Sequence, residues 1–143
     1  MARAVGRVGP TTRPPARTSS IQARSAPNSV DILGASDLVH EYSGYSSGSW
    51  VYTAWQYVPT DYTGQSYFIL LNTYVDVGTN NWSVQVQFDA GTNLVVNTGA
   101  TGGTLPLIKG QWVELATRST SMSIRSLSTT ITSSSTPAPG RTK

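Results

Sequence analysis

Two pairs of aromatic residues in one predicted strand are the side chains of this sequence best suited to bind a ligand. Trp50 and Tyr52 are followed by Trp55 and Tyr57 in the segment 49–58, so an extended chain there carries aromatic rings on both faces. One face has to fill a core, whereas the other is available as a platform for the C–H groups of sugar rings. The alternative is that all four rings pack against a second sheet or further strands.

Hairpin connections are expected to bring three more residues near this strand. The full predicted carbohydrate-binding set is therefore Trp55, Tyr57, Asn72, Tyr74 and Trp82. Aromatic rings supply the stacking surface, and the amide supplies hydrogen bonds to sugar hydroxyl groups.

The carboxylates lie too far apart in the sequence to predict glycoside hydrolysis, which uses two of them on either side of the scissile bond. Of the two glutamates, Glu41 and Glu114, only Glu41 has another carboxylate within four residues, at Asp37. The single histidine, His40, lies in the predicted strand 37–42, where a structural role is simpler than that of a triad base. No catalytic residue is predicted, and the protein is not expected to be an enzyme.

One turn is a candidate for binding a cation. Asp76 and Asn80 lie in the segment 74–81 and, with loop carbonyls, offer the oxygen ligands that calcium prefers. A single carboxylate is few for a divalent cation, and Asn/Gly sequences are typical of hairpin turns, so an ordinary turn is the better interpretation. The chain has no cysteine, which excludes disulfides and thiolate metal sites. No cofactor is expected.

Strands are the elements that have to position these side chains. Apolar and polar residues alternate without interruption over 82–89. The segments 49–58 and 66–75 are apolar or aromatic on both faces, which suits inner strands of a layered sheet. Shorter strands are predicted at 37–42, 93–97 and 111–116. Turn sequences separate these segments and no helical period occurs, so we expect an all-β fold, an antiparallel β-sandwich or jelly roll.

Charged and aromatic residues divide the chain into a middle and two flanks. All seven carboxylates and all aromatic residues lie between Asp31 and Glu114, with only one of the ten Lys and Arg residues, Lys109. The flanks are rich in Arg, Pro, Ser and Thr and lack the apolar area that a core needs. We therefore expect a folded domain over 28–116 and disordered tails over 1–27 and 117–143.

The same partition bears on the expected partners. The arginines of the first tail have no aromatic residues among them and the middle is acidic, which disfavours a nucleic-acid partner. No apolar run approaches the ~20 residues of a membrane helix, and no secretory signal peptide is visible at the start. A polysaccharide or other glycan is the expected ligand.

The stretch from Asn28 to Leu115 resembles bacterial members of the concanavalin A-like lectin/glucanase superfamily, which includes laminin-G-like domains. The motifs that carry the resemblance are NSVDI from position 28, GSWVYTAWQYVP from 48, YFILLN from 67 and LPLIKGQWVEL from 105. It implies a jelly roll of a secreted, extracellular bacterial protein, in which the GQW tryptophan, Trp112, plugs the sandwich. The catalytic E-x-D-x-E strand of the family glucanases does not occur here, so the implied function is binding of a glycan or a protein surface.

Family members continue with further strands where this chain has a Ser/Thr-rich tail, which makes the jelly roll incomplete. The gene can also be considered in a frame shifted by one base, with any third base that still encodes the residue in the given frame. In that frame residues 116–143 can be translated as DEIDLDVDTQSFYYNNQLLLYTGSWTNE, and residues 1–18 as GKGGWKGWADDPAAGAHV. Both strings restore acidic and aromatic residues, so we expect the tails to be frame-shifted. A hydrolase remnant without its catalytic strand and a non-functional product stay open as alternatives. Uncovered strands also predict self-association.

Overall fold

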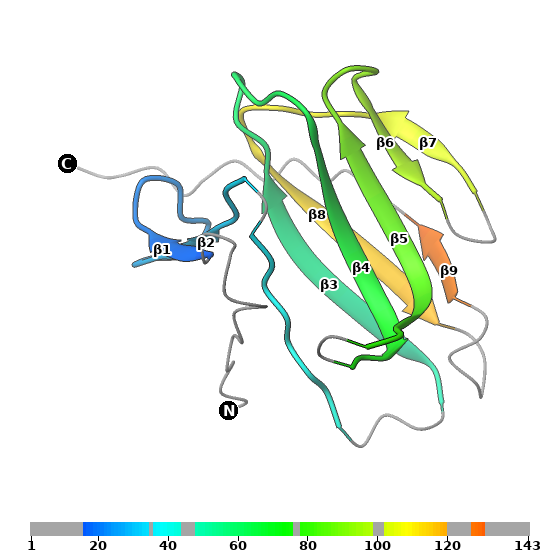
Figure 1. Cartoon of the computed structure of the whole chain (residues 1–143). Helices are drawn as coiled ribbons and strands as arrows, with labels where there is room; N and C mark the ends of the chain where they lie inside the picture. The colour runs from blue at the N-terminus through cyan, green and yellow to red at the C-terminus, as the bar shows by residue number, and fades with distance from the viewer. Residues whose placement is uncertain are drawn as a thin grey trace. The chain divides into compact units, whose positions relative to one another are not determined.

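The computed structural model describes residues 16–34, 36–43, 48–75, 78–98, 102–119 and 127–130 (Figure 1). This part of the chain consists of strands and turns without a helix, which confirms the predicted all-β fold of antiparallel sheets. None of these residues belongs to a helix that is long and apolar enough to cross a membrane. The chain divides into two compact units. The first unit is Met1–Tyr45 with Tyr74–Thr79, and the second unit is Ser46–Thr73 with Asn80–Lys143.

The described strands of the second unit form two antiparallel sheets, drawn as two layers in Figure 1. One sheet has the strand order β3-β8-β9, with β3 at Trp50–Tyr57, β8 at Trp112–Ser119 and β9 at Leu127–Thr130. The other sheet has the order β4-β5-β6-β7, with β4 at Gln65–Thr73, β5 at Asn81–Asp89, β6 at Leu94–Asn97 and β7 at Thr104–Pro106.

The core of the second unit lies between these sheets. Along β5, Val84, Val86 and Phe88 are buried, whereas the residues between them are only half-buried, as the strict alternation predicts. Val95 of β6 and Leu115 of β8 belong to the same buried cluster, so both sheets contribute to one core. Each such side chain contributes roughly 1.5–3 kcal/mol by its removal from water.

A cavity of about 130 Å³ remains between the sheets. Its lining is mainly apolar and includes Val58, Phe88 and Leu105, together with Gln56 of β3 and Val113 of β8. Glu114 and Leu115 of β8 also border the cavity.

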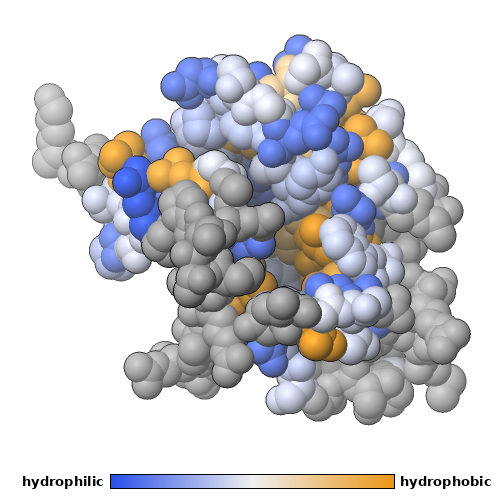
Figure 2. Space-filling model, in the orientation of Figure 1, coloured by the Kyte–Doolittle hydropathy of each residue, from blue (hydrophilic) through white to orange (hydrophobic). Residues whose placement is uncertain are grey.

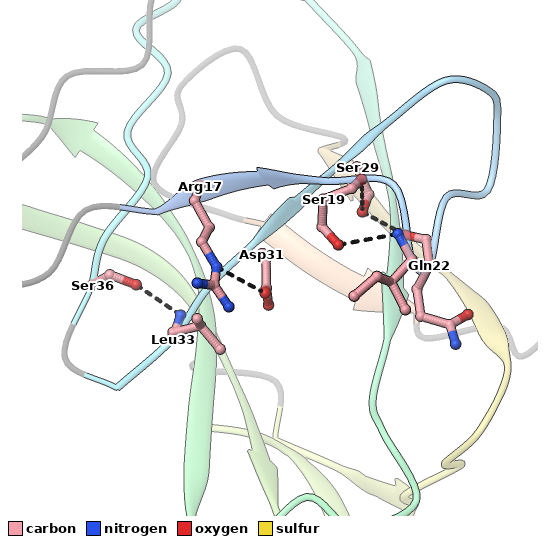
Figure 3. A network of polar contacts seen from close by, with 8 residues as sticks. Arg17, Ser19, Gln22, Ser29, Asp31, Leu33 and Ser36 are labelled. Atoms are coloured by element: carbon pink, nitrogen blue, oxygen red, sulfur yellow. Dashed lines mark hydrogen bonds and ion pairs between the residues drawn. The ribbon is translucent and has the colours of Figure 1, made fainter.

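The first unit contains a two-stranded ribbon of β1, Arg17–Ser19, and β2, Ser29–Asp31. Figure 3 shows polar contacts within the ribbon and in the segment after it. Arg17 Nε lies 3.5 Å from Asp31 Oδ2, the Ser29 hydroxyl donates to the Gln22 carbonyl, and the Leu33 N–H donates to Ser36 Oγ at 2.9 Å. The ion pair is largely exposed to solvent and contributes at most about 1 kcal/mol.

Strands β1 and β9 fall in ranges that the composition assigns to disordered tails. Residues 16–27 include β1 and most of the connection to β2. In the β3-β8-β9 sheet, β8 extends to Ser119 and β9 is formed by Leu127–Thr130. Backbone hydrogen bonds within a short ribbon do not require large apolar side chains, which is why composition does not detect it. Residues 1–15, 120–126 and 131–143 lie outside the described residues.

The segment 37–42, in contrast, forms no strand, although Val39 makes an isolated bridge. Leu38 is exposed, so the segment does not bury its apolar residue as a strand of a packed sheet would. The other predicted strands agree with β3, β4, β5, β6 and the first part of β8 to within a few residues.

Candidate functional site

The two faces of β3 carry different aromatic residues. The ring of Tyr52 stacks on Phe68 of β4 at a centroid distance of 5.3 Å and an interplanar angle of 28°, and Gln56 lines the internal cavity. The even-numbered residues of β3 therefore point toward the other sheet. Because side chains alternate along a strand, Trp55 and Tyr57 point to the outer face.

The neighbouring strand β8 adds a third aromatic ring to this outer face. The register pairs Tyr57 with Trp112 and Trp55 with Glu114, and directly paired residues share a face. The rings of Tyr57 and Trp112 are in contact, with centroids 5.6 Å apart and planes inclined by 54°. We call Trp55, Tyr57, Trp112 and Glu114 the outer aromatic patch.

The turn before β8 fixes Trp112 beside Tyr57. The N–H of Gly110 donates to the carbonyl of Val58, just after β3, at 2.8 Å. Gly110 has a φ of +76°, and a Cβ placed there would lie 2.9 Å from Cγ2 of Thr60. A glycine is therefore needed both for the backbone conformation and for the close approach of the two segments.

Trp112 thus has a different place from the one that the family resemblance implies. It was expected to plug the sandwich, but it is half-buried on the outer face, and the buried core cluster is formed by smaller side chains and Phe88. The reason is the parity of β8: Leu115 belongs to the buried core cluster, so Trp112, three positions earlier, lies on the opposite face together with its partner Tyr57.

The outer aromatic patch has the chemistry of a sugar-binding surface. All four of its side chains are half-buried, so each one packs against its neighbours and still exposes part of its surface. Aromatic ring faces attract the C–H groups of sugar rings, and a carboxylate accepts hydrogen bonds from sugar hydroxyl groups.

The five residues predicted to bind carbohydrate do not form one surface. Trp55 and Tyr57 lie together on the outer face of the β3-β8-β9 sheet, whereas Asn72 and Trp82 belong to the other sheet, in β4 and β5. Tyr74 belongs to the first unit. Trp112 and Glu114 were not among the predicted residues, because only the long-range pairing of β3 with β8 brings them to Trp55 and Tyr57.

The remaining candidates for metal binding and catalysis gain no support from the geometry. Asp76 lies outside the described residues, and Asn80 is half-buried. Among the residues that the structure describes, no group of three or more His, Asp or Glu side chains could hold a metal ion. The ring of His40 packs edge-to-face against Tyr42, with a centroid distance of 4.3 Å.

Comparison with known proteins leaves the site to be interpreted from its own geometry. No family model matches the chain, and neither the curated proteins nor the solved structures gave a match.

Proposed function

We propose that this chain is a non-catalytic module that binds a neutral glycan on the outer aromatic patch. The observation that carries the proposal is the contact between Tyr57 and Trp112, which places two rings side by side on the same face as Trp55. Glu114 lies opposite Trp55 and supplies an acceptor for hydroxyl groups. The likeness of the sequence motifs to concanavalin A-like and laminin-G-like domains is consistent with an extracellular glycan-binding role.

The inclination of the two rings indicates which form of glycan fits. Planes that meet at 54° cannot both lie flat on an extended planar surface, such as that of a crystalline polysaccharide. A single soluble chain can present successive sugar rings at different angles and so contact both residues. We therefore propose a soluble, single-chain glycan as the ligand.

A substitution of Trp112 tests this proposal. Trp112→Ala removes one of the two contacting rings and is expected to weaken binding about tenfold, the equivalent of about 1.4 kcal/mol. Binding of cellohexaose, xylohexaose and laminarihexaose is measured by the change in tryptophan fluorescence, and circular dichroism confirms that the variant is folded.

Trp82→Ala provides a matched control, because Trp82 is 53 % exposed but lies in the other sheet. It is expected to leave the affinity unchanged. Equal losses in the two variants, or no fluorescence response to any of the three sugars in the parent chain, would overturn the proposal.

A further inference from the structure

A chain of hydrogen-bonded polar side chains crosses the surface of β4 and β5. Gln87 Nε2 donates to the Tyr67 hydroxyl at 3.2 Å, and the Tyr67 hydroxyl donates to Gln65 Oε1 at 3.0 Å. Gln65 Nε2 in turn donates to Asp89 Oδ2 at 3.1 Å. We call Gln65, Tyr67, Gln87 and Asp89 the polar ladder.

The polar ladder lies on the outer face of its sheet. The register pairs Gln65 with Asp89 and Tyr67 with Gln87. The intervening pair is Ser66 with Phe88, and Phe88 belongs to the buried core, so the ladder lies on the opposite face. Figure 2 shows hydrophilic residues gathered over the upper parts of β4 and β5. This face and the outer aromatic patch belong to different sheets of the same unit, and both point away from the core between them.

The polar ladder is fixed at one end by the backbone of a turn. Asp89 Oδ1 accepts hydrogen bonds from the N–H groups of Gly91, at 2.7 Å, and Thr92, at 3.3 Å. The Gly91 N–H is the main reason that the pKa of Asp89 is lowered from its ordinary value. Asp89 is thus a stationary acceptor that orients Gln65, and Gln65 orients the hydroxyl of Tyr67. Side chains already held in one arrangement lose little conformational entropy when a ligand binds.

The geometry points to the polar ladder as a second carbohydrate-binding surface, for a neutral, hydroxyl-rich glycan. Tyr67 is 47 % exposed and offers a ring face at the centre of the ladder. The two glutamine amides keep one N–H each beyond the bonds within the ladder, and their carbonyl oxygens accept further hydrogen bonds. Alternating donors and acceptors around an aromatic ring match a sugar, whose hydroxyl groups both donate and accept.

The charge on this face selects against the other polymers that bind to flat polar surfaces. Strands β4 to β7 contain no lysine or arginine, and Asp89 contributes a negative charge. Nucleic acids and anionic polysaccharides require cations at their binding surface. A protein partner is disfavoured as well, because the centre of a stable protein interface is depleted of charge and more apolar than this ladder.

Isothermal titration calorimetry of the full chain with cellohexaose, xylohexaose and laminarihexaose tests the inference. Two binding surfaces on opposite outer faces predict a stoichiometry of two sugars per chain. Tyr67→Ala is expected to lower the stoichiometry to one and to leave the tryptophan fluorescence response unchanged. Tyr67→Phe keeps the ring but breaks the ladder, and is expected to weaken the calorimetric site about fivefold while both sites persist.

The same titration separates this inference from the proposed function. If Trp112→Ala weakens one site about tenfold and Tyr67→Ala abolishes the other, both are supported. If only Tyr67→Ala lowers the stoichiometry and no fluorescence response occurs, the second surface stands and the outer aromatic patch fails. A stoichiometry in the parent chain that Tyr67→Ala leaves unchanged, or no calorimetric binding of any of the three sugars, would overturn the inference. The melting temperature of each variant, measured in parallel, shows that a loss of binding is not a loss of fold.

Discussion

The contact between Tyr57 and Trp112 depends on how a single residue turns the chain before β8. Gly110 has a left-handed backbone conformation and also lies against Thr60, so two separate costs oppose a side chain there. The sugar-binding geometry proposed above is therefore tied to a position that contacts no ligand itself.

Gly110→Ala is expected to destabilise the fold by about 2 kcal/mol, because it combines backbone strain with the approach to Thr60. Gly64→Ala is the matched control: Gly64 also has a positive φ, +88°, but a Cβ there would meet nothing within 4 Å. The control should lose about 1 kcal/mol from backbone strain alone. Equilibrium urea unfolding measures both variants, and equal losses would show that the Thr60 contact is unimportant.

At the scale of elements, the turn between β5 and β6 couples stability to pH. Asp89 accepts the hydrogen bonds of the turn amides more strongly when it is ionised, so its pKa is lower in the folded protein than its ordinary value of 3.8. A lowered folded-state pKa means that the stabilisation is complete above the unfolded pKa and is lost as the pH falls through the folded value.

Asp89→Asn is therefore expected to flatten the dependence of stability on pH below 3.8. The measurement is the free energy of unfolding in urea at a series of pH values between neutrality and the acid range. Parallel curves for the parent chain and the variant across the acid range would contradict the role of Asp89 in this turn.

Strand existence was largely predictable from the sequence, whereas strand pairing was not. The alternation in 82–89 and the apolar segments 49–58 and 66–75 correspond to β5, β3 and β4, because periodicity records which face of a strand is buried. The short strands β7 and β1 have no such signal: β7 is three residues long, and β1 lies in an exposed ribbon.

For the candidate site, too, the positions within one strand were predictable, whereas the contacts between strands were not. The spacing of Trp55 and Tyr57 placed both on one face of β3, as the structure has them. Their neighbours Trp112 and Glu114 follow from the pairing with β8, which joins residues far apart in the sequence and is set by tertiary packing. The alternation in β5 predicts that Gln87 and Asp89 lie on the face opposite the core. Their hydrogen bonds with Gln65 and Tyr67 depend on the register with β4, which the sequence does not specify.

At the scale of the whole molecule, the second unit has strand edges that matter for association. Strand β9 pairs only with Ala116–Ser119 of β8, so no described strand pairs with the Trp112–Leu115 half of β8 on that side. Unpaired edges favour pairing with other chains. The self-association expected from the sequence stays a prediction, and this half-strand is the place where we expect it to occur.

A sandwich with a ligand-binding surface on each outer side would cross-link long polymers. Each copy of the chain would hold one polysaccharide strand on the outer aromatic patch and another on the polar ladder, and many copies would turn a solution of separate coils into a network. We expect the low-shear viscosity of a polysaccharide solution to rise on addition of the parent chain, with the polysaccharide chosen by the sugar that binds in the titrations. Tyr67→Ala should remove that rise, because a chain with one binding surface cannot cross-link, and Trp112→Ala should reduce it. A rise that persists in both single variants would show that the network forms through association of the protein with itself.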